Sequence, residues 1–332
     1  MKEALLYDQL SDKKVKCNLC NWHCTILPDK QGTCGVRKNV DGKLYSLVYG
    51  KPCSIAVDPI EKKPLFHFLP GEAILSIGTS GCNFFCLGCQ NYDISQGKFD
   101  ENDFKAVSPE EIISETKAKD CKMIAFTYNE PTIFYEYFID IAKLAKNEGI
   151  KTVMVSNGYM TEKALNEILK YIDAINVDLK SFSEDFYRNY CKTKLKPVLD
   201  NLKRMKGKTW LEITNLVIPG MDDKPEEIEE MCKWIKENVG DVPLHFSRFF
   251  PMYKATGKDV TPLKTLLKAK EIADKYLSYI YIGNIETEKG ENTYCPKCKA
   301  LLIERRRYVI TKNVVKDGKC PECGFKISGV WP

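Results

Sequence analysis

Three cysteines with short gaps form the strongest chemical signal in the sequence. Cys82, Cys86 and Cys89 are separated by three and two residues, and they follow an apolar run at 74–77. This arrangement predicts a tight loop at the end of a buried strand, with the thiolates presented together as metal ligands. Three thiolates are one short of a closed four-ligand site, so one metal position stays open. An open position indicates chemistry more than structural support.

A second group of four cysteines lies near the start of the chain. Cys17, Cys20, Cys24 and Cys34 follow a C-x2-C-x3-C-x9-C pattern, which strongly indicates metal binding. Zinc is the simpler prediction, because four thiolates close a tetrahedron and brace a small module that lacks a large core. A second iron–sulfur cluster is the alternative, since cysteine spacing does not separate the two.

Two C-x2-C pairs near the end of the chain form a third group. Its members are Cys295, Cys298, Cys320 and Cys323. Strand-like runs at 301–303 and 308–310 lie between the pairs, as expected for a zinc ribbon. We predict zinc at this site, with rubredoxin-like iron as the alternative.

Alternating apolar and amphipathic stretches predict the elements that position these cysteines. We expect strands at 74–77, 123–127, 152–155, 174–177, 211–217, 244–249 and 279–282. We expect helices at 108–118, 132–147, 161–171, 184–205 with a break at Pro197, 225–238 and 262–276. Repeated strand–helix units imply a parallel sheet with right-handed crossovers. The predicted fold class is α/β, a partial (βα)6 TIM-like barrel rather than the closed eightfold form.

The composition changes near residues 70 and 288, which suggests three domains. We expect a cysteine-rich metal-binding module at 1–70, the partial barrel at 71–288 and a zinc-ribbon or rubredoxin-like module at 289–332. The length of 332 residues suits one large barrel with small attachments.

Polar residues follow several of the predicted strands, where parallel barrels place their active sites. Such residues can each be explained as a turn former, a helix cap or a solvated charge. Because they recur at the same end of successive strands, we expect them to line one site. They are Asn129, Glu130, Ser156, Asn157, Asp178 and Lys180, and His245 belongs to the sixth strand.

These features together resemble the radical S-adenosylmethionine (SAM) superfamily, and most closely its pyruvate formate-lyase activating enzyme branch. The resemblance implies that Cys82, Cys86 and Cys89 bind a [4Fe–4S] cluster whose fourth iron chelates SAM, with Phe85 beside the adenine. The other SAM-binding positions that it implies are Asn129, Glu130, Ser156, Asn157, Asp178, Lys180 and His245. The segment 128–131 keeps the acid and proline of the corresponding family motif but lacks both of its glycines.

The whole chain also resembles a narrower group, the radical SAM member of the AmmeMemoRadiSam system. Segments 57–68, 90–91, 127–132 and 245–251 carry this likeness, which extends to the terminal cysteine module. The resemblance implies Memo-type and AMMECR-type proteins as partners. It also implies an external electron donor such as flavodoxin or ferredoxin.

Composition and charge narrow the remaining classes. No run of eighteen apolar residues and no secretory signal is present, so we expect a cytoplasmic protein without a membrane partner. Most of the fifteen cysteines lie in clusters, which favours metal ligation in a reducing compartment over disulfides. The formal charge of +5 counts no thiolates, and metal-bound thiolates would offset it to about zero. Nucleic acid is therefore not favoured as a partner.

The resulting hypothesis is reductive cleavage of SAM and removal of a hydrogen atom from a substrate by the 5'-deoxyadenosyl radical. The substrate is a protein residue, for which the activating-enzyme likeness suggests a glycyl residue, or a small molecule. No general acid or base is needed beyond the cluster and SAM, and Cys191 is more simply a buried thiol than a substrate contact. One alternative is an RNA-modifying or RNA-binding protein anchored by its ribbon, with the run 305–307 on phosphates. Another is a structural or electron-transfer protein.

Overall fold

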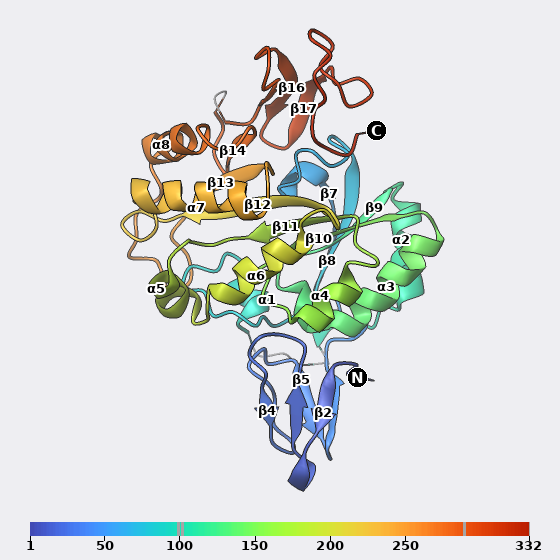
Figure 1. Cartoon of the computed structure of the whole chain (residues 1–332). Coiled ribbons are helices and arrows are strands. Elements are labelled where there is room, and N and C mark those ends of the chain that lie inside the picture. Colours follow the sequence, from blue (N-terminus) through green and yellow to red (C-terminus); the bar gives the residue numbers. More distant parts are fainter. Residues whose placement is uncertain (98–99, 101–102, 288–289, 332) are drawn as a thin grey trace.

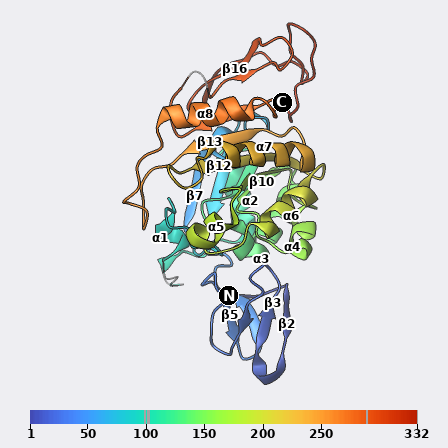
Figure 2. The ribbon, with the colours of Figure 1, turned by 60° about the vertical axis from the view of Figure 1, so that its left-hand side comes forward.

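A central eight-stranded sheet connects two small cysteine-bearing modules in the computed structural model (Figure 1). The structure describes residues 1–97, 100, 103–287 and 290–331. The N-terminal module lies at the bottom of Figure 1, and the C-terminal module lies at the top. Figure 2 shows the same separation after rotation. The two modules therefore occupy opposite ends of the molecule.

The central sheet has the order β14-β13-β12-β11-β10-β9-β8-β7. Strands β8 to β14 pair in parallel, whereas β7 pairs antiparallel with β8 at one edge. This open order confirms the predicted α/β class and its strand–helix repeats. The strands are β7 (Ser54–Pro59), β8 (Ala73–Gly78), β9 (Met123–Phe126), β10 (Lys151–Ser156), β11 (Ala174–Asp178), β12 (Trp210–Val217), β13 (Leu244–Arg248) and β14 (Ile280–Gly283).

Helices connect successive strands and cover the outer face of the sheet (Figures 1 and 2). They are α1 (Tyr92–Ser95), α2 (Pro109–Ala118), α3 (Tyr135–Asn147), α4 (Glu162–Ile168), α5 (Glu184–Phe186), α6 (Lys196–Met205), α7 (Pro225–Asn238) and α8 (Leu263–Ala273). Shorter turns are η1 (Ser11–Lys13), η2 (Ile60–Lys62), η4 (Pro131–Phe134) and the π-helical η5 (Tyr187–Cys191). No helix in these described ranges is long and apolar enough to cross a bilayer.

Helix α2 illustrates why local sequence sets several of these boundaries. The Ser108 side chain accepts a hydrogen bond from the Glu111 N–H, and the Glu111 carboxylate accepts one from the Ser108 N–H. This capping box satisfies backbone groups that the first helical turn leaves unpaired. The predicted start of α2 is confirmed.

The predicted helix break at Pro197 was wrong. Pro197 lies in the first turn of α6, where its missing N–H costs no hydrogen bond. The chain instead leaves the helix after η5, where Lys192 takes a left-handed φ of 60°. The proline therefore begins a helix and does not interrupt one.

The segment after β7 fills the amino end of the sheet interior. Ile60, Leu65 and Phe68 pack against the early residues of β8 to β11, including Ile74 and Met123. The chain between β7 and β8 is thus a plug that closes this end of the barrel. The carboxyl ends of the strands remain for the candidate site.

The N-terminal module consists of two three-stranded antiparallel sheets, β1-β6-β5 and β2-β3-β4. It packs on α3 through the ion pair between Arg37 and Glu136, whose side chains are fully buried. The strands are β1 (Lys2–Glu3), β2 (Tyr7–Gln9), β3 (Val15–Cys17), β4 (Thr25–Ile26), β5 (Arg37–Val40) and β6 (Lys43–Ser46).

The C-terminal module is a small antiparallel sheet with β15 (Thr293–Tyr294), β16 (Leu301–Arg306) and β17 (Val309–Asn313). It packs on the plug, where Arg305 donates a hydrogen bond to the Phe66 carbonyl. The predicted domain boundaries stay predictions. However, β7 precedes the boundary placed at residue 70 and joins the central sheet, and the boundary at 288–289 lies outside the described residues.

Candidate functional site

The loop between β8 and α1 carries Cys82, Cys86 and Cys89 at the carboxyl end of its strand. Gly81 precedes the first cysteine with a φ of 91°. A Cβ at Gly81 would lie 2.7 Å from the carbonyl oxygen of Cys34. Glycine is required here because it permits both the positive φ and the close approach of another backbone. The loop is therefore packed directly against the N-terminal module.

Two asparagines after neighbouring strands hold this loop from the barrel side. Asn129, after β9, donates to the Gly81 carbonyl at 2.8 Å and accepts from the Thr79 N–H at 3.2 Å. Asn157, after β10, donates to the Asn83 side-chain oxygen at 2.7 Å. Both asparagines are predicted site residues, and the structure brings them together on the cysteine loop.

Glu130 connects the same two strand ends. Its carboxylate accepts hydrogen bonds from the Ser156 hydroxyl and the Asn157 N–H, each at 2.8 Å, and from Thr132. Burial raises the pKa of Glu130 above its usual value. The observed contacts make Glu130 an organising residue for the loops that hold the cysteines.

Tyr128 occupies the position where the family motif has a glycine. Its φ is 70°, in the left-handed region that non-glycine residues rarely adopt. The Tyr128 hydroxyl donates to Asp58 at 2.7 Å, and the buried Lys63 ammonium also binds Asp58 at 2.7 Å. These contacts hold the strained residue in place. The turn thus keeps its backbone conformation without the glycine.

Asp178 and Lys180 lie after β11 and form an ion pair at 3.0 Å. Although burial opposes the charge, Asp178 and Cys86 help raise the pKa of Lys180 well above its usual value. Cys191, at the end of the π-helical turn, lies beside Cys86, and its thiol helps lower the Cys86 pKa. A cation is therefore placed next to a predicted cluster ligand, where it would stabilise negative charge.

The surroundings of the cysteine loop fit a sulfur-rich cluster. Asn83 Nδ2 and Tyr190 Oη are buried and have no hydrogen-bond partner among the described residues. Tyr190 packs against the loop so closely that a Cβ at Gly88 would lie 2.2 Å from its hydroxyl. Buried donors normally find acceptors, and cluster sulfurs supply them.

Phe85 and His245 differ in their relation to this site. Phe85 lies on the loop and is 39% exposed, so the residue is accessible to a ligand. His245 is the second residue of β13, near the amino end of the strand. Its Nε2 lies 2.6 Å from Glu212 Oε2, and its ring packs on Phe66.

The role of His245 in SAM binding stays a prediction, although its contacts in the structure are with Glu212 and the plug. Glu212 also accepts the N–H groups of Phe66 and His67, so this network secures the plug. The sequence placed His245 in the sixth strand but did not show that it lies near the amino end of that strand.

The four N-terminal cysteines converge on one small cavity. Leu19, Ile26, Arg37 and Ile133 are among the residues that line it with the thiols. Burial raises the pKa of Cys34 to about 11, and Cys17 and Cys24 contribute by charge repulsion. Four thiols that line one cavity and repel one another as thiolates require a cation or cluster for ionisation.

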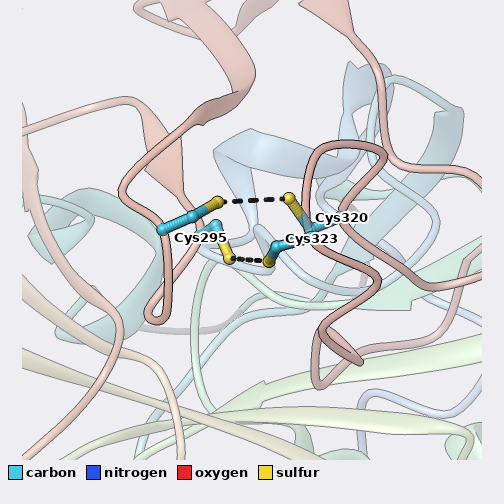
Figure 3. Close-up of side chains that lie close together, drawn as sticks. Cys295, Cys320 and Cys323 are labelled. Carbon is cyan, nitrogen blue, oxygen red and sulfur yellow. Dashed lines mark hydrogen bonds between the residues drawn. The ribbon is translucent and has the colours of Figure 1, made fainter.

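The C-terminal cysteines form a more compact group, shown in Figure 3. Cys295 and Cys323 have their sulfurs 3.6 Å apart, as do Cys298 and Cys320. All four sulfurs lie within 4.8 Å of one another, as one tetrahedral metal ion requires. This arrangement can bind a metal ion.

Arg305 of the C-terminal module is not available to nucleic acid. It is only 3% exposed and donates to Thr293 at 2.8 Å and to the Phe66 carbonyl at 2.8 Å. Arg305, the first residue of the predicted basic run, is therefore buried where the module packs on the plug and is not available to bind phosphates. This packing weakens the RNA-anchor hypothesis.

Sequence reasoning missed Asn83, Tyr190 and Arg37 as parts of metal-site surroundings. Asn83 could have been predicted as a neighbour of the cluster, because it directly follows Cys82 in the chain. Tyr190 and Arg37 could not, since each reaches its site only through tertiary packing.

A seven-strand parallel partial barrel with three cysteines after its first parallel strand defines an enzyme class organised around a metal cluster. Comparison with known protein families supports this class, because the family described as "Radical SAM superfamily" matches residues 76–235. The uncharacterized protein MJ0808 of Methanocaldococcus jannaschii is 43% identical over 334 residues, covering 98% of this chain and 99% of that protein. The chain belongs to the radical SAM superfamily.

Two further comparisons describe its relationships. The pyruvate formate-lyase-activating enzyme of Clostridium pasteurianum is 30% identical over 130 residues, covering 37% of this chain and 53% of that enzyme. The crystal structure of a radical SAM methyltransferase from Sphaerobacter thermophilus has a TM-score of 0.51 at 11% identity. It covers 66% of this chain and 68% of that one, which supports the fold. The protein is thus an enzyme whose cofactors include a [4Fe–4S] cluster and SAM.

Proposed function

We propose that Cys82, Cys86 and Cys89 hold the [4Fe–4S] cluster of this enzyme and that its substrate is a residue of a partner protein, with glycine the favoured hydrogen donor. The observation that carries the site assignment is the hydrogen bonding of Asn129 and Asn157 to the cysteine loop. The sequence similarity to an activating enzyme supports the choice of substrate. A small-molecule substrate is the alternative.

When bound, the reduced cluster and SAM supply a 5'-deoxyadenosyl radical that removes a hydrogen atom from the substrate. The chain positions these groups. Asn129 and Asn157 hold the loop at Gly81 and Asn83, on both sides of the first cysteine. Gly81 sets the approach of the loop to the N-terminal module.

The ion pair between Lys180 and Asp178 places a positive charge next to Cys86. We assign the Lys180 ammonium the role of stabilising the negative cluster through Cys86, with Asp178 orienting the ammonium. Phe85 and Ser156 complete the proposed SAM pocket, the first as an exposed aromatic residue and the second through its contact with Glu130. Glu130 acts as a positioning residue for Ser156 and Asn157.

We propose zinc at the C-terminal four-cysteine site, because its sulfur spacing suits one tetrahedral ion. We further propose a flavodoxin- or ferredoxin-type reductant. Memo-type and AMMECR-type proteins are proposed as partners, without an assigned reaction. A cytoplasmic location is proposed because the sequence contains no run of eighteen apolar residues and no secretory signal.

The decisive experiment is anaerobic incubation of reconstituted, dithionite-reduced enzyme with SAM, with 5'-deoxyadenosine measured by chromatography. We expect deoxyadenosine from the enzyme and none from a Cys86→Ala variant, while a Cys121→Ala variant outside the site retains activity. Candidate partner proteins are then added, and the true substrate should accelerate deoxyadenosine formation and acquire a radical detectable by electron paramagnetic resonance. Cleavage by the Cys86→Ala variant would contradict the site assignment.

A further inference from the structure

The N-terminal four-cysteine site differs in geometry from the C-terminal one. In the described part of the chain, the ribbon is the one group with at least three ligand atoms all within 4.8 Å of one another. Cys17, Cys20, Cys24 and Cys34 nevertheless line one cavity. Their thiols therefore surround a common space at a larger separation than the ribbon thiols.

This difference distinguishes two kinds of metal centre. Around a zinc ion, four thiolates at about 2.3 Å from the metal must lie in contact with one another. In a cubane cluster each thiolate binds a different iron, so irons and sulfides separate the ligands. The cysteines of the radical SAM loop also form no close group. The N-terminal cysteines thus share the wider spacing of an iron–sulfur site.

Arg37 provides an independent observation at the same cavity. Its side chain is 1% exposed and lines the cavity. Glu136 binds Nη2, whereas Nε and Nη1 have no hydrogen-bond partner among the described residues. Two buried donors without a partner, on a side chain that lines a thiol-bearing cavity, indicate an acceptor nearby, and inorganic sulfides are such acceptors.

The cavity lies next to the radical SAM loop. The Cys34 carbonyl and the Val36 side chain would each be 2.7 Å from a Cβ at Gly81, the residue before Cys82. Trp22, between Cys20 and Cys24, donates from its indole N–H to the Asn83 carbonyl at 2.7 Å. Short paths through one van der Waals contact and one hydrogen bond therefore join the two cysteine groups.

We propose that Cys17, Cys20, Cys24 and Cys34 bind a second [4Fe–4S] cluster, which passes electrons to the cluster of the radical SAM loop. This role rests on the function proposed above, whereas the metal assignment does not. The step moves one electron from a reduced flavin or iron–sulfur carrier protein to the N-terminal cluster, and then one electron onward. No bond forms or breaks in this transfer.

The metal assignment is tested in a chain without the radical SAM ligands. We would prepare the Cys82→Ala, Cys86→Ala and Cys89→Ala triple variant and measure iron, acid-labile sulfide and zinc after anaerobic reconstitution. We expect about four irons and four sulfides per chain, with the Mössbauer spectrum of a cubane. Zinc at both four-cysteine sites and no iron would overturn the proposal.

A matched variant adds Cys20→Ser and Cys24→Ser to the triple variant. We expect it to lose the iron and keep the ribbon metal, with far-ultraviolet circular dichroism reporting whether the barrel remains folded. If that variant does not fold, iron and sulfide analysis of the unaltered enzyme still decides, because two cubanes require about eight irons per chain. A count of about four irons in that enzyme would contradict the assignment.

The electron-transfer role is tested with two reductants and the Cys20→Ser, Cys24→Ser double variant. We expect dithionite, which is small, to support deoxyadenosine formation in this variant, whereas reduced flavodoxin supports it at least tenfold more slowly than in the unaltered enzyme. Equal rates with flavodoxin would overturn the relay. Absence of deoxyadenosine from the unaltered enzyme with both reductants would instead contradict the proposed function and leave the metal assignment standing.

Discussion

Replacement of Gly81 by alanine tests the contact between the N-terminal module and the cysteine loop. The residue combines a φ of 91° with a neighbouring carbonyl oxygen 2.7 Å from any added Cβ. The Val36 Cγ1 atom would lie at the same distance on the packed side. Neither neighbour can move freely, because one is backbone and the other belongs to the core.

The expected loss of stability follows from two terms. A left-handed conformation costs a non-glycine residue about 1–2 kcal/mol. Overpacking by one methyl group in a close-packed contact costs about 1–3 kcal/mol more. We therefore expect the Gly81→Ala variant to lose about 2–5 kcal/mol in its free energy of unfolding.

Gly207→Ala is the matched control. Gly207 has a φ of 69°, but a Cβ there would meet no atom within 4 Å. We expect only the strain of about 1–2 kcal/mol, so the two variants should differ by about 1–3 kcal/mol. Urea unfolding of both variants, followed by circular dichroism, measures this difference.

The same samples report on function, because a displaced loop should hold its metal less well. After anaerobic reconstitution and gel filtration, we expect the Gly81→Ala variant to retain less iron than the Gly207→Ala variant. Equal stability and equal iron retention in the two variants would refute the argument that a close backbone contact positions the loop.

Three further predictions test separate parts of the structure. Asn157→Leu removes the hydrogen bond to the buried Asn83 side chain, so we expect a loss of about 1–3 kcal/mol in urea unfolding and lower iron retention. Asn166→Leu on the exposed face of helix α4 should change neither. Burial lowers the pKa of His67 to about 4, so the unfolded chain binds more protons between pH 4 and 6.5, and stability should fall by about 3 kcal/mol as the pH drops through this window. The His67→Gln variant should lack this part of the pH dependence in acid titrations, and an unchanged dependence would contradict the assignment to His67. Cys298→Ser should release the ribbon metal without loss of iron, as measured by elemental analysis, and concurrent loss of iron would contradict the separation of the sites.

Local sequence signals predicted most of the barrel because they act over a few residues. Apolar runs marked the seven parallel strands, and the Ser108 and Glu111 capping pair set the start of α2. The antiparallel edge strand β7 was not among the predicted strands. Its pairing with β8 depends on a contact with a strand beyond the plug, which local patterns do not report.

The candidate site was predicted in composition but not in its internal contacts. Asn129, Glu130 and Asn157 were expected to bind SAM. In the structure Asn129 and Asn157 hydrogen-bond to the cysteine loop, and Glu130 accepts the Asn157 N–H. The contact of His245 with Glu212 was not predicted, because residue order alone does not show where a side chain lies relative to the plug.

The amino-acid sequence alone determined the three cysteine groups, the α/β class and the resemblance to radical SAM enzymes. Spacing and periodicity are sufficient for these because ligands and apolar faces recur at short intervals. Only the tertiary structure showed that the N-terminal cysteines lie against the radical SAM loop with wider spacing than the ribbon cysteines. Distances between distant segments arise from packing, and packing decides which metal a set of thiolates can hold.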